Sequence, residues 1–336
     1  MAKISVIGAG SWGTALAVLL DGNGHEVTLW SFLESEVTML KEEREQKDKL
    51  PEIKISEKVY ITKDLEEAIT DKEVVVLAVP STVIRSTAAK CAVYAKAGQV
   101  FVNVAKGIEE NSLLSMTEVI AEEIPQANVA VLSGPSHAEE VGRGIPTTIV
   151  VGAKDQKTAQ YLQNIFMSEK FRVYISSDMV GIELGGALKN VVALAAGIAD
   201  GLGYGDNTKA ALITRGIAEI SRLGLAMGGK YETFCGLTGI GDLIVTCASK
   251  HSRNRRAGVL IGQGYSYAEA MDEVKMVVEG VYSAKAAMAL GRKYQVSLPI
   301  IEKVNEVLFE GLSAADAVKE LMIRDKTIEH SLVDWE

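Results

Sequence analysis

Hydrophobic residues in the first half of this 336-residue chain occur as short, mostly β-branched runs separated by polar segments. Continuous runs of this length are typical of parallel strands that are buried on both faces of a sheet. They predict strands at residues 3–7, 26–30, 58–61, 74–79, 100–104, 129–132, 147–152 and 171–174. Helical segments between them, such as one starting at Asp64, predict an α/β domain with a doubly wound sheet of the Rossmann type.

From about Met179 the pattern changes to long helical periodicities with almost no strand candidates. Residues 181–199 are hydrophobic nearly all round, which predicts a buried helix. Further helices are expected at residues 209–223, 267–274, 281–293, 300–309 and 314–322. Asp206, Asn207 or Thr208 is suited to cap the first of these. We therefore predict a dinucleotide-binding domain over residues 1–178 and an all-α substrate and catalytic domain over residues 179–336.

The formal net charge of −9 argues against a general polyanion-binding surface, which needs an excess of Lys and Arg. We therefore expect no nucleic-acid partner, and any phosphate site must be local. Cys91, Cys235 and Cys247 form no Cys-x-x-Cys pair and are expected to be reduced thiols. The chain enters a strand directly, and its apolar run at residues 191–199 is too short for a bilayer. These features predict a cytoplasmic protein without a membrane segment.

The first predicted strand runs into Gly8-x-Gly10-x-x-Gly13, and a small-residue helical pattern follows at once. This context of strand, turn and helix is the one that a dinucleotide-binding motif requires. Gly8 allows the tight turn, Gly10 lets the backbone approach a pyrophosphate, and Gly13 lets the helix lie close to the strand. The anion then binds at the helix N-terminus. An ordinary strand–helix connection is the alternative, and the agreement of all three parts favours nucleotide binding.

In such domains an acid at the end of the second strand binds the ribose hydroxyls of NAD. This position holds Ser31, followed by Phe32 and Leu33. The missing acid would tolerate a 2′-phosphate, but no Arg or Lys stands next to it to bind one. The choice between NAD and NADP therefore stays open. The charged run at residues 35–49 is expected to be a solvated helix face and its exit.

Ligands of open α/β sheets bind outside the carboxyl ends of the strands. By that rule Lys106 and the loop at residues 134–136 should face one shared crevice. Lys189 lies in the most buried predicted helix, where a charge is costly unless it has a partner or a function. A lysine that extends from the helix edge to water is the ordinary alternative. Asp242 follows a glycine-rich segment, and a surface turn with a capping Asp is its alternative.

Residues 249–256 form a dense basic cluster in this acidic chain. Arg guanidinium groups match phosphate oxygens bidentately, so we favour a substrate-phosphate site over a solvated turn or a nucleic-acid patch. The histidines lack metal-ligand spacing, and no metal is expected; they are His25, His137, His251 and His330. Hydrolase and kinase functions are disfavoured, because the sequence has neither a Gly-x-Ser-x-Gly elbow nor a Walker loop.

Several motifs together resemble those of the bacterial, NAD(P)-dependent glycerol-3-phosphate dehydrogenases. They follow in the same order over most of the chain, at residues 8–15, 105–107, 133–136, 187–190, 203–215, 237–242 and 252–254. An ordered set of motifs is far more specific than the glycine motif alone. The resemblance implies reversible hydride transfer between NAD(P)H and dihydroxyacetone phosphate, which gives sn-glycerol 3-phosphate for phospholipid synthesis.

The resemblance also implies roles for individual residues. Lys189 would be the acid/base residue, provided that burial or a neighbouring cation lowers its pKa. The residues that would orient Lys189 and the substrate oxygens are Asp242, Asn190 and Lys106. The implied substrate contacts are Lys106, Gly134, Ser136, Lys189, Asp242, Ser252, Arg253 and Asn254, with the last three at the phosphate. The implied cofactor contacts are Gly8, Gly10, Ser11, Trp12, Gly13, Lys106, Ala138, Arg253, Val277 and Glu279.

Phe32 and Leu33 depart from the pattern of the related enzymes, which commonly carry a basic residue there for the 2′-phosphate, and residues 47–51 match only loosely. Two other functions stay open. A two-domain hydroxyacid dehydrogenase or ketopantoate-type reductase shares the architecture, and its carboxylate substrate could also bind at residues 252–254. A redox sensor would bind the nucleotide without turnover. The apolar helices of the second half are compatible with a homodimer.

Overall fold

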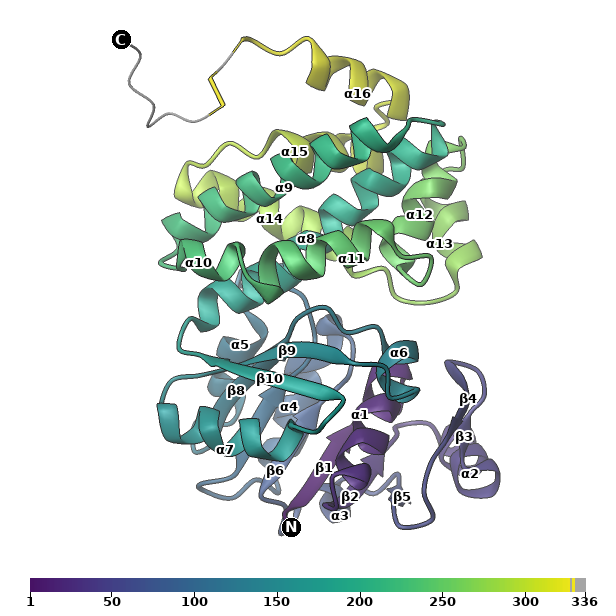
Figure 1. Cartoon of the computed structure of the whole chain (residues 1–336), viewed down its shortest axis with the longest axis vertical. Coiled ribbons are helices and arrows are strands. Elements are labelled where there is room, and N and C mark those ends of the chain that lie inside the picture. Colours follow the sequence, from purple (N-terminus) through teal and green to yellow (C-terminus); the bar gives the residue numbers. More distant parts are fainter. Residues whose placement is uncertain (327, 330–336) are drawn as a thin grey trace.

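A computed structural model describes residues 1–326, 328 and 329, and the chain consists of a sheet-containing half and a helical half (Figure 1). The strands of the main sheet are β1 (Lys3–Ile7), β2 (Glu26–Trp30), β5 (Tyr60–Thr62), β6 (Val74–Leu77), β7 (Val100–Asn103), β8 (Asn128–Ser133), β9 (Thr147–Ala153) and β10 (Phe171–Ser176). Their order is β10-β9-β8-β7-β6-β1-β2-β5. Neighbouring strands are parallel except β8 and β9. The predicted α/β sheet is confirmed, with one antiparallel pair that the sequence does not reveal.

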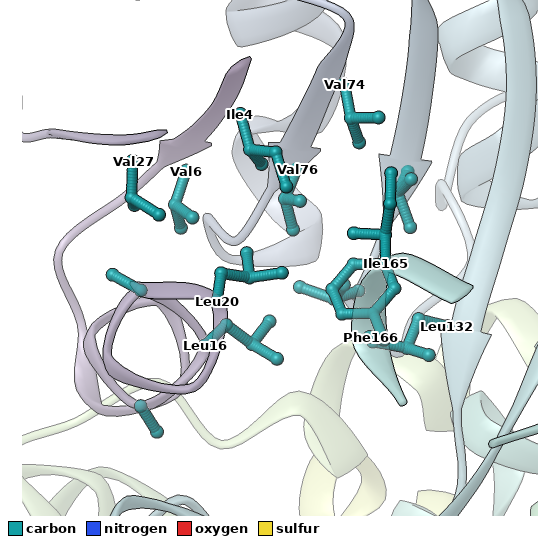
Figure 2. Close-up of a cluster of buried hydrophobic side chains, with 14 of the residues drawn as sticks. Ile4, Val6, Leu16, Leu20, Val27, Val74, Val76, Leu132, Ile165 and Phe166 are labelled. Atoms are coloured by element: carbon teal, nitrogen blue, oxygen red, sulfur yellow. The ribbon is translucent and has the colours of Figure 1, made fainter. Parts of the chain in front are cut away.

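Helices cover both faces of this sheet. They are α1 (Ser11–Gly22), α2 (Glu34–Glu43), α3 (Leu65–Ile69), α4 (Ile84–Ala92), α5 (Met116–Glu123), α6 (Ala138–Gly142) and α7 (Gln156–Phe166). Ile4 lies in one buried cluster with Leu16 of α1 and Phe166 of α7 (Figure 2). Val75 belongs to the cluster on the other face, with Ile120 of α5. Successive residues of a strand point to opposite faces, so both faces require hydrophobic residues and the runs are continuous.

The second half is helical, as predicted. Its helices are α8 (Met179–Gly201), α9 (Asp206–Ala226), α10 (Tyr231–Phe234), α11 (Asp242–Ala248), α12 (Arg253–Gly262), α13 (Tyr267–Val274), α14 (Glu279–Tyr294), α15 (Pro299–Asn305) and α16 (Ala314–Met322), with π-helical turns at Leu237–Gly241 and Glu306–Glu310. Helices α9, α11, α12, α14 and α15 all contact α8, which is the core helix of this half. By length and composition α8 could cross a membrane, but its most apolar window is wholly buried within the protein.

Helices α8 and α12 cross with their backbones in contact. Gly197 and Gly201 of α8 meet Gly258 and Gly262 of α12 at this crossing. A Cβ on Gly258 would lie 2.1 Å from a carbonyl oxygen of α8, and a Cβ on Gly197 would lie 2.1 Å from a carbonyl oxygen of α12. Side chains would force the helices apart, because close approach of two backbones needs glycine. The first turn of α12 is therefore held directly against α8.

The charged run at residues 35–49 contains the solvated helix face that its charges predict, since Lys41, Glu42 and Glu43 are exposed on α2, but its exit is more ordered than expected. Helix α2 ends at Glu43 because Arg44 takes a left-handed backbone with a φ of 50°. A hairpin of β3 (Glu45–Gln46) and β4 (Leu50–Lys54) follows. Glu36 and Gln46 are buried, and they satisfy each other through a hydrogen bond of 2.6 Å. A charge pattern does not show such pairing. Hydrogen bonds between buried polar groups offset the free-energy cost of removing those groups from water.

One further detail, the cap of α9, differs from the sequence predictions. Helix α9 begins at Asp206, with Gly205 at its N-cap and no capping side chain, so the predicted cap at residues 206–208 is wrong. Glycine is a favoured N-cap residue as well. The change from strands to helices falls between β10 and α8, and we propose the domain boundary there. Of the predicted second domain, residues 327 and 330–336, including His330, lie outside the described residues.

Among the described residues, no cysteine or histidine shares a hydrogen bond with the ion cluster described below. Cys91 and Cys247 are buried, and burial raises the pKa of each thiol to about 12. Cys235 is also unpaired with another cysteine. Across residues 1–326, 328 and 329, no group of three or more His, Cys, Asp and Glu side chains could hold a metal ion.

Candidate active site

The glycine-rich loop joins β1 to α1 where the sheet changes its direction of growth, since β1 pairs with β2 on one side and β6 on the other. Ligands of open α/β sheets bind outside the strand ends at such a point. Gly8 has a φ of 116°, and a Cβ there would lie 2.7 Å from the carbonyl oxygen of Ala78. A Cβ on Gly13 would lie 1.8 Å from the carbonyl oxygen of Gly8. Both positions therefore require glycine.

The same loop leaves space for a pyrophosphate. A Cβ on Gly10 would meet no atom within 4 Å. Gly10 is the N-cap of α1, and no side chain caps this helix in the described structure. The N–H groups of Ser11 and Trp12 open the helix, where unpaired N–H groups and the positive end of the helix dipole attract an anion. The residues present therefore fit the pyrophosphate of NAD or NADP.

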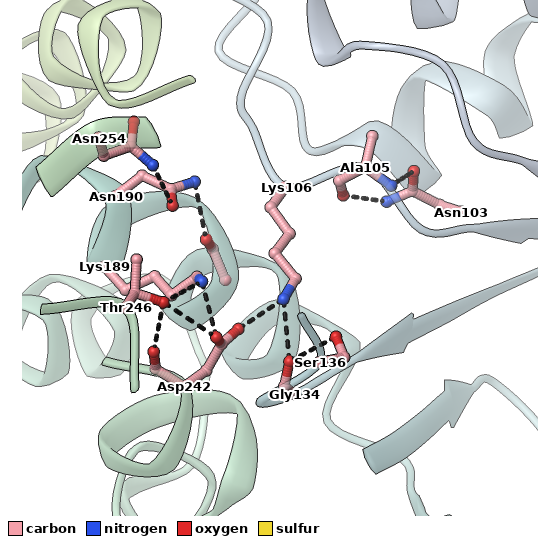
Figure 3. A network of polar contacts seen from close by, with 11 residues as sticks. Asn103, Ala105, Lys106, Gly134, Ser136, Lys189, Asn190, Asp242, Thr246 and Asn254 are labelled. Atoms are coloured by element: carbon pink, nitrogen blue, oxygen red, sulfur yellow. Dashed lines mark hydrogen bonds and ion pairs between the residues drawn. The ribbon is translucent and has the colours of Figure 1, made fainter. Parts of the chain in front are cut away.

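Lys189, Asp242 and Lys106 form an ion cluster between the two halves of the chain (Figure 3). Asp242 Oδ1 accepts a hydrogen bond from Lys189 Nζ at 2.6 Å, and Asp242 Oδ2 accepts one from Lys106 Nζ at 2.6 Å. Lys189 lies on α8 and Asp242 begins α11, whereas Lys106 follows β7. Lys106 Nζ also donates to the carbonyl oxygen of Gly134 at 2.9 Å. The structure thus brings Lys106 and the loop after β8 together.

Burial sets the protonation of this cluster. Lys189 is 5% exposed and Asp242 is 1% exposed. Burial lowers the pKa of Lys189 to about 8; the Asp242 carboxylate opposes this shift and the Lys106 ammonium adds to it. Burial acts to raise the pKa of Asp242, but the charges of Lys106 and Lys189 outweigh it and lower that pKa. Lys189 can therefore exchange a proton near neutral pH while Asp242 stays a carboxylate.

Thr246 completes the surroundings of Lys189, and the sequence analysis missed it. Lys189 Nζ donates to the Thr246 hydroxyl at 2.6 Å, and that hydroxyl donates to the carbonyl oxygen of Asp242 at 2.6 Å. Thr246 lies four residues after Asp242 on α11, which places both on one helix face. The surface-turn alternative for Asp242 is wrong, since Asp242 is buried at a helix start. Recognising that helix would have pointed to Thr246.

Asn190 takes part in a second group of contacts. Its Oδ1 accepts a hydrogen bond from Asn254 Nδ2 at 2.9 Å, and Asn254 Oδ1 accepts one from the backbone N–H of Gly280 at 2.8 Å. These bonds join α8, α12 and α14. No hydrogen bond between described residues connects Asn190 with Lys189, so the structure gives no direct contact for the orienting role that the resemblance implies.

Ser252 and Arg253 stand at the N-terminus of α12. The Ser252 hydroxyl accepts a hydrogen bond from the backbone N–H of Arg255 at 3.2 Å and caps the helix. The Arg253 side chain is exposed and has neither a hydrogen bond nor an ion pair within the described part of the chain. An uncommitted guanidinium beside a helix N-terminus is suited to bind phosphate oxygens.

Other predicted residues lie around the same junction. The Ser136 hydroxyl donates to the carbonyl oxygen of Gly134 at 2.9 Å, and Ala138 begins α6. Glu279, the first residue of α14, accepts from the backbone N–H of Ser81 at 3.1 Å and from the Ser81 hydroxyl. This contact links the helical half to the segment after β6. Val277 lies half-buried two residues before α14.

Comparison with known proteins shows the family of this chain. A family model for the NAD-dependent glycerol-3-phosphate dehydrogenase N-terminus matches residues 3–159, and one for the C-terminus matches residues 178–319. The chain belongs to the glycerol-3-phosphate dehydrogenase family. A glycerol-3-phosphate dehydrogenase (NAD(P)+) from Agathobacter rectalis is 63% identical over 100% of both chains. The crystal structure of a glycerol-3-phosphate dehydrogenase from Coxiella burnetii has a TM-score of 0.93 at 36% identity, covering 96% of this chain and 99% of its own.

The glycerol-3-phosphate dehydrogenase family is favoured over the rival class with the same architecture. A ketopantoate reductase structure from Ralstonia eutropha covers 94% of this chain and 99% of its own, with a TM-score of 0.61 at 18% identity. That likeness shows a shared fold alone. The two glycerol-3-phosphate dehydrogenase models, in contrast, match both halves of the chain in order.

Proposed function

We propose that this chain reversibly interconverts dihydroxyacetone phosphate and sn-glycerol 3-phosphate with NAD(H) or NADP(H), in the cytoplasm, and so supplies glycerol 3-phosphate for phospholipid synthesis. The observation that carries the proposal is the ion cluster of Lys106 with the buried Lys189 and Asp242, in a chain of this family. The coenzyme, when bound, supplies or accepts the hydride at substrate C2. The protein contributes the proton for the C2 oxygen, the positive charge that stabilises this oxygen, and the alignment of substrate and coenzyme.

Lys189 is the proposed acid/base residue. An ammonium group has three N–H donors, and Lys189 uses one for Asp242 and one for Thr246. The third N–H is left for the substrate C2 oxygen. During reduction this proton moves from Nζ to the oxygen while the C2–O double bond becomes single and the C2–H bond forms. In the reverse direction the neutral amine removes the hydroxyl proton, for which a pKa of about 8 is well placed.

Lys106 is proposed to stabilise negative charge that develops on the same oxygen. Lys106 donates one N–H to Asp242 and one to the carbonyl oxygen of Gly134, so the third N–H of its ammonium group remains for the substrate. Two ammonium groups held by one buried carboxylate are preorganised and need no rearrangement during the reaction. Asp242 therefore acts by positioning both lysines.

The phosphate group is proposed to bind at the start of α12. Arg253 offers an uncommitted guanidinium, and the Asn254 carboxamide has one N–H left after its bond to Asn190. Ser252 adds its hydroxyl proton there, while Gly134 and Ser136 face the substrate from the first half. The coenzyme contacts comprise the glycine-loop residues, together with Lys106, Ala138, Arg253, Val277 and Glu279. Ordered alignment of these groups reduces the entropic part of the barrier.

The proposal is tested by following oxidation of NADH and of NADPH with dihydroxyacetone phosphate. We expect Lys189→Ala to lower kcat by about 10²- to 10⁴-fold, the usual range for loss of a general acid. Arg253→Ala should raise KM for the substrate about 10- to 100-fold, because a charged hydrogen bond is lost. Arg256→Ala is the matched control, since Arg256 is exposed on the same helix.

Failure of both coenzymes to react, although they bind, would refute the substrate assignment. Retention of more than about a tenth of the activity in Lys189→Ala would refute its acid/base role. A homodimer formed by the helical half is a further part of the proposal, and sedimentation of the full chain tests it.

A further inference from the structure

A buried polar cluster occupies the carboxyl end of β2, where the adenosine ribose of a dinucleotide lies in this type of domain. We call Ser31, Glu36, Gln46 and Lys49 the ribose-corner cluster. Ser31 directly follows β2 and is buried. Gln46 Nε2 donates to the carbonyl oxygen of Ala9 in the glycine-rich loop at 2.7 Å. The cluster therefore reaches from the end of β2 to the loop that fits the pyrophosphate.

Glu36 is the centre of the ribose-corner cluster. Its Oε1 accepts hydrogen bonds from Gln46 Nε2 and from Lys49 Nζ, both at 2.6 Å. Its Oε2 accepts one from the Ser31 hydroxyl. Glu36 is 8% exposed, whereas the Lys49 side chain is 37% exposed. The positive charge of Lys49 is thus already committed to an internal carboxylate.

The chemistry of this corner favours a hydroxyl over a phosphate. Glu36, which is 8% exposed, offers a carboxylate acceptor at this corner, whereas the unpaired Gln46 Oε1 is fully buried. Phe32 and Leu33 are exposed and uncharged. A ribose 2′-hydroxyl can donate to the Glu36 carboxylate. A 2′-phosphate, in contrast, is a multiply charged acceptor and needs an uncommitted cation.

We propose that Glu36 makes this chain select NAD(H) over NADP(H). Helix α2 supplies the acid that is missing at Ser31, and this acid neutralises Lys49. The sequence hides the arrangement because Glu36 lies five residues beyond Ser31 and Lys49 arrives from the hairpin after α2. The inference rests on the proposed function, since it concerns the coenzyme site of the same reaction.

The test measures dissociation constants of NADH and NADPH by titration calorimetry with the full chain, in the absence of substrate. The natural chain should bind NADPH at least about tenfold more weakly than NADH, because a 2′-phosphate meets a carboxylate and no free cation. Glu36→Gln keeps an oxygen acceptor but removes the charge and frees Lys49. This variant should tighten NADPH binding at least about fivefold and change NADH binding less than about threefold.

Two further variants identify the cause. Adding Lys49→Ala to Glu36→Gln should abolish the gain in NADPH affinity, since the freed ammonium is then gone. Glu42→Gln is the matched control, because exposed Glu42 lies on the same helix and its replacement frees no lysine of the described chain. It removes the same net charge and should change the ratio of the two affinities by less than about twofold, as an exposed charge is screened.

Equal affinities of the natural chain for NADH and NADPH would overturn the inference without any variant. A shift in Glu42→Gln as large as that in Glu36→Gln would also overturn it, because the effect would then be one of net charge. Turnover of dihydroxyacetone phosphate is measured separately. Selective NADH binding without turnover refutes the proposed function alone, and turnover without selectivity refutes this inference alone.

Discussion

Replacing Asp242 by Asn removes the negative charge that lies between two lysine ammonium groups. Lys189 Nζ and Lys106 Nζ each lie 2.6 Å from an oxygen of this carboxylate, which is 1% exposed. The carboxylate opposes the effect of burial on Lys189, whose pKa is already lowered to about 8. Its loss must therefore lower the pKa of Lys189 further.

The size of this shift follows from the geometry. Coulomb's law with an effective dielectric constant of about 20 gives about 6 kcal/mol for opposite charges 2.6 Å apart. One pKa unit corresponds to about 1.36 kcal/mol, so the upper bound is somewhat more than four units. The Asn oxygen keeps a hydrogen bond and water relaxes the site, so we expect a drop of about one to three units. The pKa of Lys189 should then lie between about 5 and 7.

The assay is the pH profile of kcat/KM for reduction of dihydroxyacetone phosphate. In the proposed mechanism reduction needs the protonated lysine, so the rate should fall as pH rises through the pKa of Lys189. The natural chain should lose activity above about pH 8, and Asp242→Asn should lose it one to three units lower. Thermal unfolding checks the fold, because breaking a buried ion pair costs about 3–5 kcal/mol.

Asp200→Asn is the control for this experiment. Asp200 also joins two cations, at 2.9 Å from Lys209 and 2.7 Å from Arg255, but outside the cluster. Replacing Asp200 should leave unchanged the pH at which kcat/KM falls. The electrostatic account of Lys189 would be refuted by a folded Asp242→Asn variant whose kcat/KM still falls near pH 8 or at a higher pH.

Two further predictions concern stability. Glu219 is buried and accepts hydrogen bonds from the backbone N–H groups of Ile300 and Ile301; burial raises its pKa from 4.5 to about 7. The unfolded chain therefore loses this proton first, and the group's contribution to the free energy of unfolding should fall by about 3 kcal/mol as pH rises from about 4.5 to 7. Urea unfolding of the natural chain and Glu219→Gln at several pH values measures this, and a parallel pH dependence in both contradicts it. Gly258→Ala should destabilise the chain by about 3 kcal/mol, because its Cβ would lie 2.1 Å from a carbonyl oxygen. Gly22→Ala is its control, since a Cβ there meets no atom within 4 Å, and equal melting temperatures of the two variants would refute the tight crossing.

The sequence predicts much of this fold because its strongest signals are local. The continuous runs at residues 74–79 and 100–104 lie in β6 and β7, and the apolar stretch at 181–199 lies in α8. Asp64 caps α3 as its position suggests. The antiparallel direction of β9 is not predictable in this way, since a strand's hydrophobic pattern is the same in both directions.

Contacts between distant segments account for what the sequence does not predict at the site. The resemblance singles out Lys189, Asp242 and Lys106, and the structure brings them together. Thr246 is hidden because nothing in the glycine-rich stretch shows that a helix begins at Asp242. Glu36 is hidden because its burial depends on partners from a hairpin. Neither a hydrophobic periodicity nor a short sequence motif indicates such pairings, because they depend on tertiary structure.

The backbone contact between α8 and α12 fixes how far apart the backbones of two proposed site residues lie in the helical half. Lys189 lies on α8, and Arg253 begins α12, which glycines hold against α8 without intervening side chains. Side chains at an interface can repack, whereas two touching backbones have no such freedom. The separation between the backbones of Lys189, the proposed proton donor, and Arg253, the proposed phosphate-binding residue, is therefore set by main-chain geometry. With these proposed roles, a molecule whose carbonyl and phosphate stand farther apart than those of a three-carbon phosphate should be a poorer substrate.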